Sequence, residues 1–112
     1  RSDGKPSLGL IRTSAAGVDT TLKAETLAGG LTYAPGEKIK LRLQVTGTGT
    51  TTIRAKIWKA TDAEPAAWLL TATDATAGLQ AAGGLGLVTY LSSSSTNGPM
   101  VLSLDDLYVT KP

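Results

Sequence analysis

The strictest alternation of apolar and polar residues in the chain lies in KIKLRLQVTG, residues 38–47. Successive side chains of an extended strand point to opposite faces, so this pattern predicts a strand with one buried and one solvent-facing side. The buried side would carry Ile39, Leu41, Leu43 and Val45, and the solvent-facing side Lys38, Lys40, Arg42, Gln44 and Thr46.

A second alternating segment, TIRAKIWK at residues 52–59, follows directly after the glycine-bearing turn TGTGTT. Its inward positions would be Ile53, Ala55 and Ile57. Two alternating segments joined by a short glycine turn are typical of a β-hairpin, so the pair predicts one.

Five further segments have strand character and are separated by glycine-, serine- or proline-containing stretches. They are SLGLIRT (7–13), TTLKAETL (20–27), AWLLTATD (67–74), LGLVTYLS (85–92) and PMVLSLDDLYVT (99–110). About seven short strands in one chain predict an all-β fold, an antiparallel β-sandwich in which residues 1–112 form a single domain. The predicted core consists of Ile39, Leu41, Leu43, Val45, Ile53, Ile57, Leu87 and Val101.

Composition narrows the chemistry that this domain can carry. The 112 residues include no histidine and no cysteine, which removes the thiol nucleophile, the disulfide and the usual ligands of a zinc site. The net charge is +2 and the basic residues are spread along the predicted strands, so no nucleic-acid partner is expected. No apolar run reaches the ~20 residues of a membrane span. The opening RSDGKPSLG lacks the layout of a signal peptide, so an export signal either lies upstream or does not exist.

The two tryptophans flank a loop that carries acidic residues. Trp58 falls on the outward face of its strand together with Arg54 and Lys56, beside Arg42 of the neighbouring strand. An aromatic ring on a polar sheet face can stack on a sugar, but it can equally cover the end of the hairpin and stack on a basic side chain. Trp68 is predicted to be an inward core ring.

The loop between the tryptophans contains Asp62 and Glu64. Glycosidases place two carboxyl groups across a groove, and two acids in one turn do not match that requirement, so no enzyme activity is expected. Glu64 is instead expected to accept backbone N–H bonds or to pair with Arg54 or Lys56. A Ca²⁺ site formed by Asp105 or Asp106 with Asp74 is a weaker alternative to structural hydrogen bonding, and no other cofactor is expected.

Several short motifs occur in a fixed order between Tyr33 and Val109: RAKIW, EPAAW, TATD, a glycine-rich strand onset, a Ser/Thr/Asn loop and DDL. In this order they resemble the C-terminal part of the concanavalin A-like jelly-roll (LamG-like) domains of actinobacterial secreted proteins and of actinobacteriophage minor tail proteins. The resemblance implies a jelly-roll fold and an extracellular or virion-tail location. Such domains usually carry additional strands before the first one found here, so the resemblance implies that the chain is either the latter part of a larger domain or a shortened version of one.

Two functions are compatible with these features. The first is a non-catalytic carbohydrate-binding or adhesion module that contacts a cell-surface glycan through Trp58, Arg54, Lys56, Arg42 and Glu64. The second is a structural or assembly module that has no ligand of its own. Because the missing strands would leave a sheet edge unpaired, the chain is expected to be an oligomer or part of a larger polypeptide, with an interface at residues 7–27.

Overall fold

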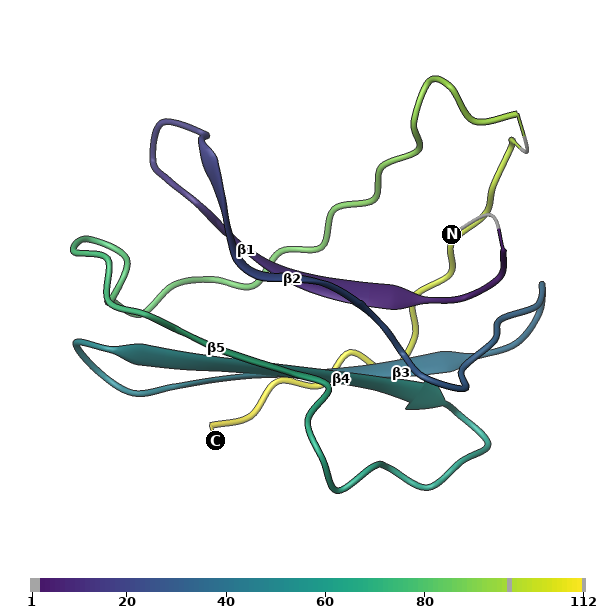
Figure 1. The fold of residues 1–112 in the computed structure, drawn as a ribbon, viewed down its shortest axis with the longest axis horizontal. Helices are drawn as coiled ribbons and strands as arrows, with labels where there is room; N and C mark the ends of the chain where they lie inside the picture. The colour runs from purple at the N-terminus through teal and green to yellow at the C-terminus, as the bar shows by residue number, and fades with distance from the viewer. Residues whose placement is uncertain (1–2, 97, 112) are drawn as a thin grey trace. The chain divides into compact units, whose positions relative to one another are not determined.

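The computed structural model describes residues 3–96 and 98–111 and is all-β in that range. Strand β1 (Ser7–Thr13) pairs with β2 (Asp19–Leu27), and β3 (Ile39–Thr46), β4 (Thr51–Lys59) and β5 (Leu70–Asp74) form a second sheet in that order (Figure 1). All three pairings are antiparallel, and the described residues contain no helix. The expected all-β antiparallel architecture is therefore confirmed. The chain divides into two compact units, residues 1–81 and 82–112, and all five strands belong to the first.

The first sheet is a hairpin of two strands. Its turn is closed by Ser14, whose backbone N–H donates to the carbonyl of Val18 at 2.9 Å, and Gly17 adopts a positive φ of 76° there. The pairing of β1 with β2 shifts register on both sides of Leu10, which marks a bulge in this part of the sheet. Within the described residues no third strand joins this sheet, so both of its outer edges remain unpaired.

The second sheet contains the hairpin that the alternation predicts. β3 and β4 pair without a register shift from Ile39 opposite Lys59 to Thr46 opposite Thr52. The turn requires glycine at position 47, because φ is 102° and an added Cβ would lie 2.4 Å from the carbonyl oxygen of Thr50. The predicted boundaries of 38–47 and 52–59 are within about a residue of the observed ones, which is inside the usual variation of strand ends.

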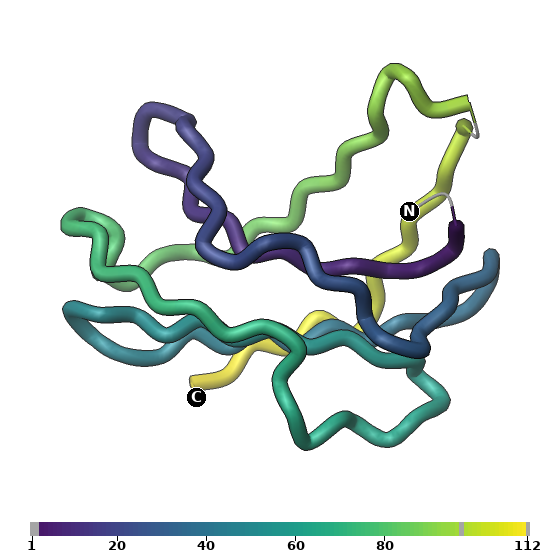
Figure 2. Tube along the Cα trace, viewed as in Figure 1, coloured from purple at the N-terminus to yellow at the C-terminus, as the bar shows by residue number. Residues whose placement is uncertain are grey.

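The two sheets of the first unit lie over one another as two layers (Figures 1 and 2), with β1 and β2 contacting β5. The buried centre between them consists of Leu10, Ala55 and Leu70, and the side chain of Leu70 is only 1% exposed. The partly buried side chains around this centre are Leu8, Leu22, Ile53, Leu69 and Ala72. Apolar side chains of two antiparallel sheets thus face one another across this centre.

Most of the residues predicted to form the core are exposed, so that prediction is wrong for them. Leu41, Leu43 and Val45 line the space between the sheets but remain about half exposed, with Leu41 at 58%. β3 is the edge strand of its sheet, and the two-stranded sheet lies over β5 at the other edge. An alternating pattern identifies the apolar face of a strand but not whether another layer covers that face.

The strands predicted at residues 85–92 and 99–110 are not formed in the described residues. Within this second unit Leu87 and Val101 are exposed rather than buried, with Val101 at 91%. A strand is stable only when its backbone groups have hydrogen-bonding partners, and an alternating sequence by itself does not supply them. The described residues therefore form five of the roughly seven strands that the sequence predicts.

Candidate functional site

The outer face of the second sheet carries most of the residues that the sequence singles out. Ile53 and Ala55 line the space between the sheets, so the alternate residues of β4 point away from it. Cross-strand pairing then places Lys56 opposite Arg42 and Trp58 opposite Lys40 on this outer face. The structure thus brings the predicted residues of β3 and β4 together on one surface.

Lys56 is the best-buried polar residue of this surface, at 6% exposure. Its ammonium group donates to the carbonyl of Pro65 at 2.7 Å and lies 2.6 Å from a carboxylate oxygen of Glu64. The ring of Trp68 adds a cation–π contact, with the ammonium nitrogen 4.7 Å from the ring centroid. A buried charge is tolerated only when it is paired and hydrogen-bonded, and the loop that follows β4 provides both kinds of partner.

Glu64 joins two cations that face each other across the strand pair. Its carboxylate lies 2.9 Å from a guanidinium nitrogen of Arg42 as well as 2.6 Å from Lys56. Like charges directly opposite one another on a sheet repel, so this carboxylate offsets a repulsion that the register would otherwise create. The hydrogen bond from Lys56 lowers the pKa of Glu64, and the charges of Arg42 and Lys40 lower it further.

Part of the expectation for Glu64 is confirmed. Its predicted pairing with Lys56 is present, whereas the other pairing is with Arg42 and not with Arg54. The lowered pKa keeps the carboxylate ionised at neutral pH. A general acid in a glycosidase needs the opposite shift, so the environment of Glu64 is that of a structural anchor for the loop.

The structure agrees with the predicted face of Trp58 but not with the predicted position of Trp68. Trp58 does lie on the outer face, but it is only 9% exposed, which leaves little of its ring open for stacking on a sugar. The prediction that Trp68 is an inward core ring is wrong, because the residue is half-buried and its ring contacts Lys56 of the outer face. β5 begins only at Leu70, so Trp68 belongs to the preceding loop and does not follow the alternation of the strand.

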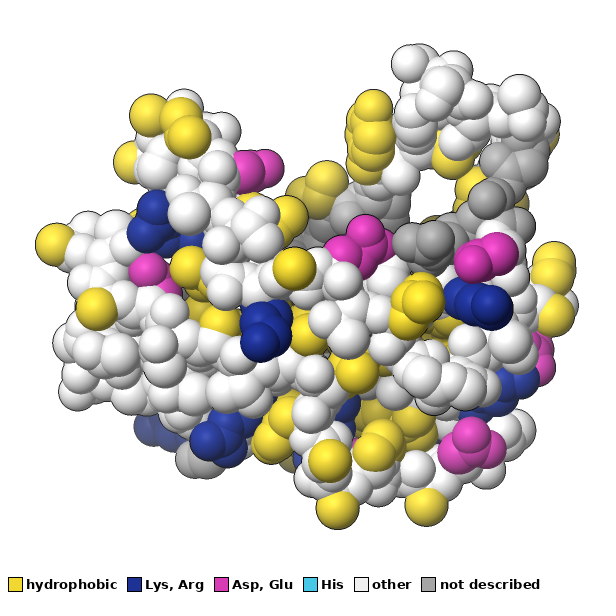
Figure 3. Space-filling view, viewed as in Figure 1, with side chains coloured by type: hydrophobic (Ala, Val, Ile, Leu, Met, Phe, Trp, Pro, Cys, Tyr) yellow, Lys and Arg dark blue, Asp and Glu magenta, His cyan; other side chains and the backbone are white. Residues whose placement is uncertain are grey.

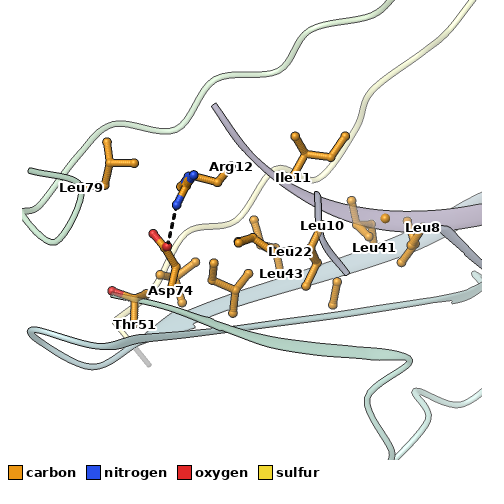
Figure 4. A pocket seen from close by; sticks show the side chains of 14 residues that line it. Leu8, Leu10, Ile11, Arg12, Leu22, Leu41, Leu43, Thr51, Asp74 and Leu79 are labelled. Carbon is orange, nitrogen blue, oxygen red and sulfur yellow. Dashed lines mark hydrogen bonds and ion pairs between the residues drawn. The ribbon is translucent and has the colours of Figure 1, made fainter. Parts of the chain in front are cut away.

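A second feature of the first unit is an apolar cleft of about 470 Å³ between the two sheets (Figure 4). One wall is formed by side chains of β1 and β2 and the other by the apolar side of β3 and β4. The apolar residues that line it include Leu8, Leu10, Ile11, Leu41, Leu43 and Val45. Because the β3 side chains are about half exposed, this cleft meets solvent along the β3 edge.

One end of the cleft holds an ion pair that sequence reasoning did not find. Arg12 of β1 lies 3.4 Å from a carboxylate oxygen of Asp74 at the end of β5, so the pair joins the two sheets. Hydrogen bonds from Thr76 lower the pKa of Asp74, and Arg12 lowers it further. Arg12 also donates to the hydroxyl of Thr20 at 2.9 Å, while its buried Nε has no hydrogen-bond partner among the described residues. Sixty-two positions separate the two residues, and no local pattern reveals such a contact.

Calcium binding stays a prediction. Asp74, one of the suggested ligands, accepts a hydrogen bond from the Thr76 hydroxyl at 2.7 Å in addition to its ion pair with Arg12. The part of the chain that the structure describes contains no group of three or more acidic, histidine or cysteine residues suited to hold a metal ion. It also contains no helix long and apolar enough to cross a membrane.

Comparison with known proteins does not place the chain in a family. It matches no family model, no curated protein and no solved structure.

Proposed function

We propose that this chain is a non-catalytic assembly module of a larger extracellular or virion-tail protein, with a concanavalin A-like jelly-roll fold. The apolar cleft along β3 is the observation that carries the proposal. Three apolar side chains in a row on one strand, Leu41, Leu43 and Val45, remain about half exposed there. Soluble monomers rarely leave such a row in water, and contiguous apolar surface of this kind marks an interaction site.

The partner that fits this cleft is an extended segment of a neighbouring chain in the same assembly. Within the described residues β3 pairs only with β4, so the backbone groups on its other edge are available to a further strand. An added strand would place every second side chain into the cleft, where apolar residues would complete the half-covered wall. Backbone hydrogen bonds would supply affinity, and the shape of the cleft would select the alternate side chains.

The first sheet offers a second unpaired edge. Ile11 of β1 is exposed and β1 carries a single charged residue, Arg12, whereas β2 is protected by charges at Asp19, Lys23 and Glu25. Charged residues on an edge strand oppose pairing with another chain, so β1 is the less protected of the two edges. An oligomer interface at residues 7–27 therefore remains part of the proposal.

Sedimentation of the isolated chain tests this function. We expect the mass to rise with protein concentration, and the variant Leu43→Asp to stay monomeric because a carboxylate in the cleft opposes burial. Gln44→Asp is the matched control, since it adds the same charge to the opposite face of β3 and leaves the cleft unchanged. A wild-type chain that remains monomeric at high concentration would contradict the proposal.

Glycan binding is the second candidate, and it depends on the outer face of the second sheet. Trp68 is half-buried there, and its ring contacts Lys56 of β4 on this polar face. A glycan-array screen with Trp68→Ala tests this candidate. Trp58 is less suitable for that purpose, because replacing so well-buried a ring would disturb the sheet itself.

A further inference from the structure

The register of the second sheet gathers basic residues that are scattered in the sequence. Lys40 and Arg42 alternate along β3, and Arg54 and Lys56 alternate along β4. Lys40 pairs with Trp58, Arg42 with Lys56 and Gln44 with Arg54, so all four cations point to the outer face. We call these four residues the basic strip. Figure 3 shows Lys and Arg side chains along the lower side of the view, where the second sheet lies.

The basic strip keeps a positive charge after its internal pairing is counted. Glu64 contacts the strip and bridges Arg42 and Lys56. Four cations and one carboxylate leave a charge of +3 on this face, although the whole chain carries only +2. The other charged residues of the chain therefore sum to a net charge of −1, since +2 minus +3 is −1.

Three members of the strip are available for a ligand. Lys40 and Arg54 form no side-chain hydrogen bond or ion pair with other described residues, and Lys40 is exposed. Arg42 is also accessible, with 57% of its side chain exposed, so it can bind an oxyanion while one of its nitrogens holds Glu64. Lys56 is too well buried to take part directly.

Neutral hydrogen-bonding groups surround the available cations. Thr71 of β5 lies opposite Arg54, and Thr73 lies opposite Thr52 on the same face. Both Thr71 and Thr73 are exposed, and Gln44 lies opposite Arg54 on the other side. Hydroxyl and amide groups of this kind bind sugar hydroxyls, while arginine and lysine bind carboxylate or sulfate oxygens.

We propose that the basic strip binds an anionic polysaccharide, one whose sugars carry carboxylate or sulfate groups. This inference rests on the glycan-binding candidate above and adds the charge class of the ligand. A single-stranded nucleic acid is the other polyanion to weigh, and its binding depends on aromatic rings on which bases stack. Trp58 is 9% exposed and Trp68 is half-buried, so the two tryptophans do not offer the successive open rings on which a single strand stacks its bases.

Binding of the full chain to dextran sulfate, neutral dextran and oligo(dT), followed by calorimetry, tests the inference. The first two polymers share one backbone and differ only in charge. We expect dextran sulfate to bind at least about tenfold more tightly than dextran, with an affinity that falls between about 50 and 200 mM salt as the charges are screened. The double variant Lys40→Gln, Arg54→Gln should weaken binding about five- to tenfold, since each exposed ionic contact contributes up to about fivefold.

The matched control is the double variant Lys5→Gln, Lys23→Gln, which removes the same charge from exposed positions outside the strip. It should change the affinity less than about twofold. An equal loss in both double variants would overturn the inference, because net charge rather than the strip would then govern binding. Oligo(dT) binding more tightly than dextran sulfate would overturn it as well. Equal binding of dextran and dextran sulfate would retain the glycan-binding candidate and reject its anionic character, whereas binding of neither polysaccharide would reject both.

Discussion

Replacing Leu70 by alanine tests whether the two sheets share the core described above. Leu70 is the first residue of β5, is 1% exposed and lies with Leu10 and Ala55 between the layers. The substitution removes three buried carbon atoms, which at about 0.8 kcal/mol each corresponds to about 2.4 kcal/mol of lost transfer free energy. A cavity adds to this loss, but the neighbouring apolar cleft allows side chains to relax into the space. We therefore expect Leu70→Ala to lower the free energy of unfolding by about 3 kcal/mol.

Leu41→Ala is the control for that substitution. It removes the same three carbons from the edge of the cleft, where the side chain is 58% exposed, so its cost should be only about 1 kcal/mol. Urea unfolding followed by tryptophan fluorescence measures both values, and an unchanged m-value confirms that each variant unfolds from a comparable state. Equal losses in the two variants would refute the distinction between a buried β5 and an open β3. A loss below about 1 kcal/mol for Leu70→Ala would refute the shared core itself.

Three further predictions follow from the loops and charges. Trp68→Ala should cost about 1–2 kcal/mol in urea unfolding, the value of a half-buried ring with one cation–π contact; a loss above about 3 kcal/mol would restore Trp68 to the core. Gly47→Ala should lower the melting temperature clearly more than Gly49→Ala, because both positions have positive φ but only at Gly47 does a Cβ meet backbone; equal shifts would contradict the turn geometry. The folded pKa values of Glu64 and Asp74 lie below their unfolded values, so their contribution is complete above about pH 5 and is lost as the pH falls through the folded values. The urea midpoint should fall on acidification, and Glu64→Gln should flatten that fall; a midpoint that instead rises on acidification would contradict it.

The β3–β4 hairpin could be predicted from the sequence because every signal for it is local. Alternation fixes which residues share a face, and the glycine at position 47 permits the turn that joins the strands. The grouping of Arg42, Lys56 and Trp58 on one face follows from the same alternation once the strands are paired in antiparallel register. For this reason the sequence alone predicts which residues of β3 and β4 share the outer face.

The strands predicted in the second unit show the limit of the same signal. LGLVTYLS and PMVLSLDDLYVT contain the apolar and β-branched residues typical of strands, yet the described residues there form no strand. An apolar–polar pattern indicates which side chains a segment would bury if it were paired with another strand in a sheet. Pairing depends on backbone partners far away in the sequence, and these are not encoded in the segment itself.

The sequence by itself determined the all-β class, the central hairpin and the division of each of its strands into an apolar and a polar face. Tertiary structure alone decided which of those faces became covered. The loop that holds Glu64 and Trp68 folds over the polar face and buries Lys56, whereas the apolar face at Leu41 stays half open because the first sheet lies over β5. Burial depends on contacts between segments that are distant in the chain. The alternating pattern of a strand does not show which layer, if any, packs against each of its faces.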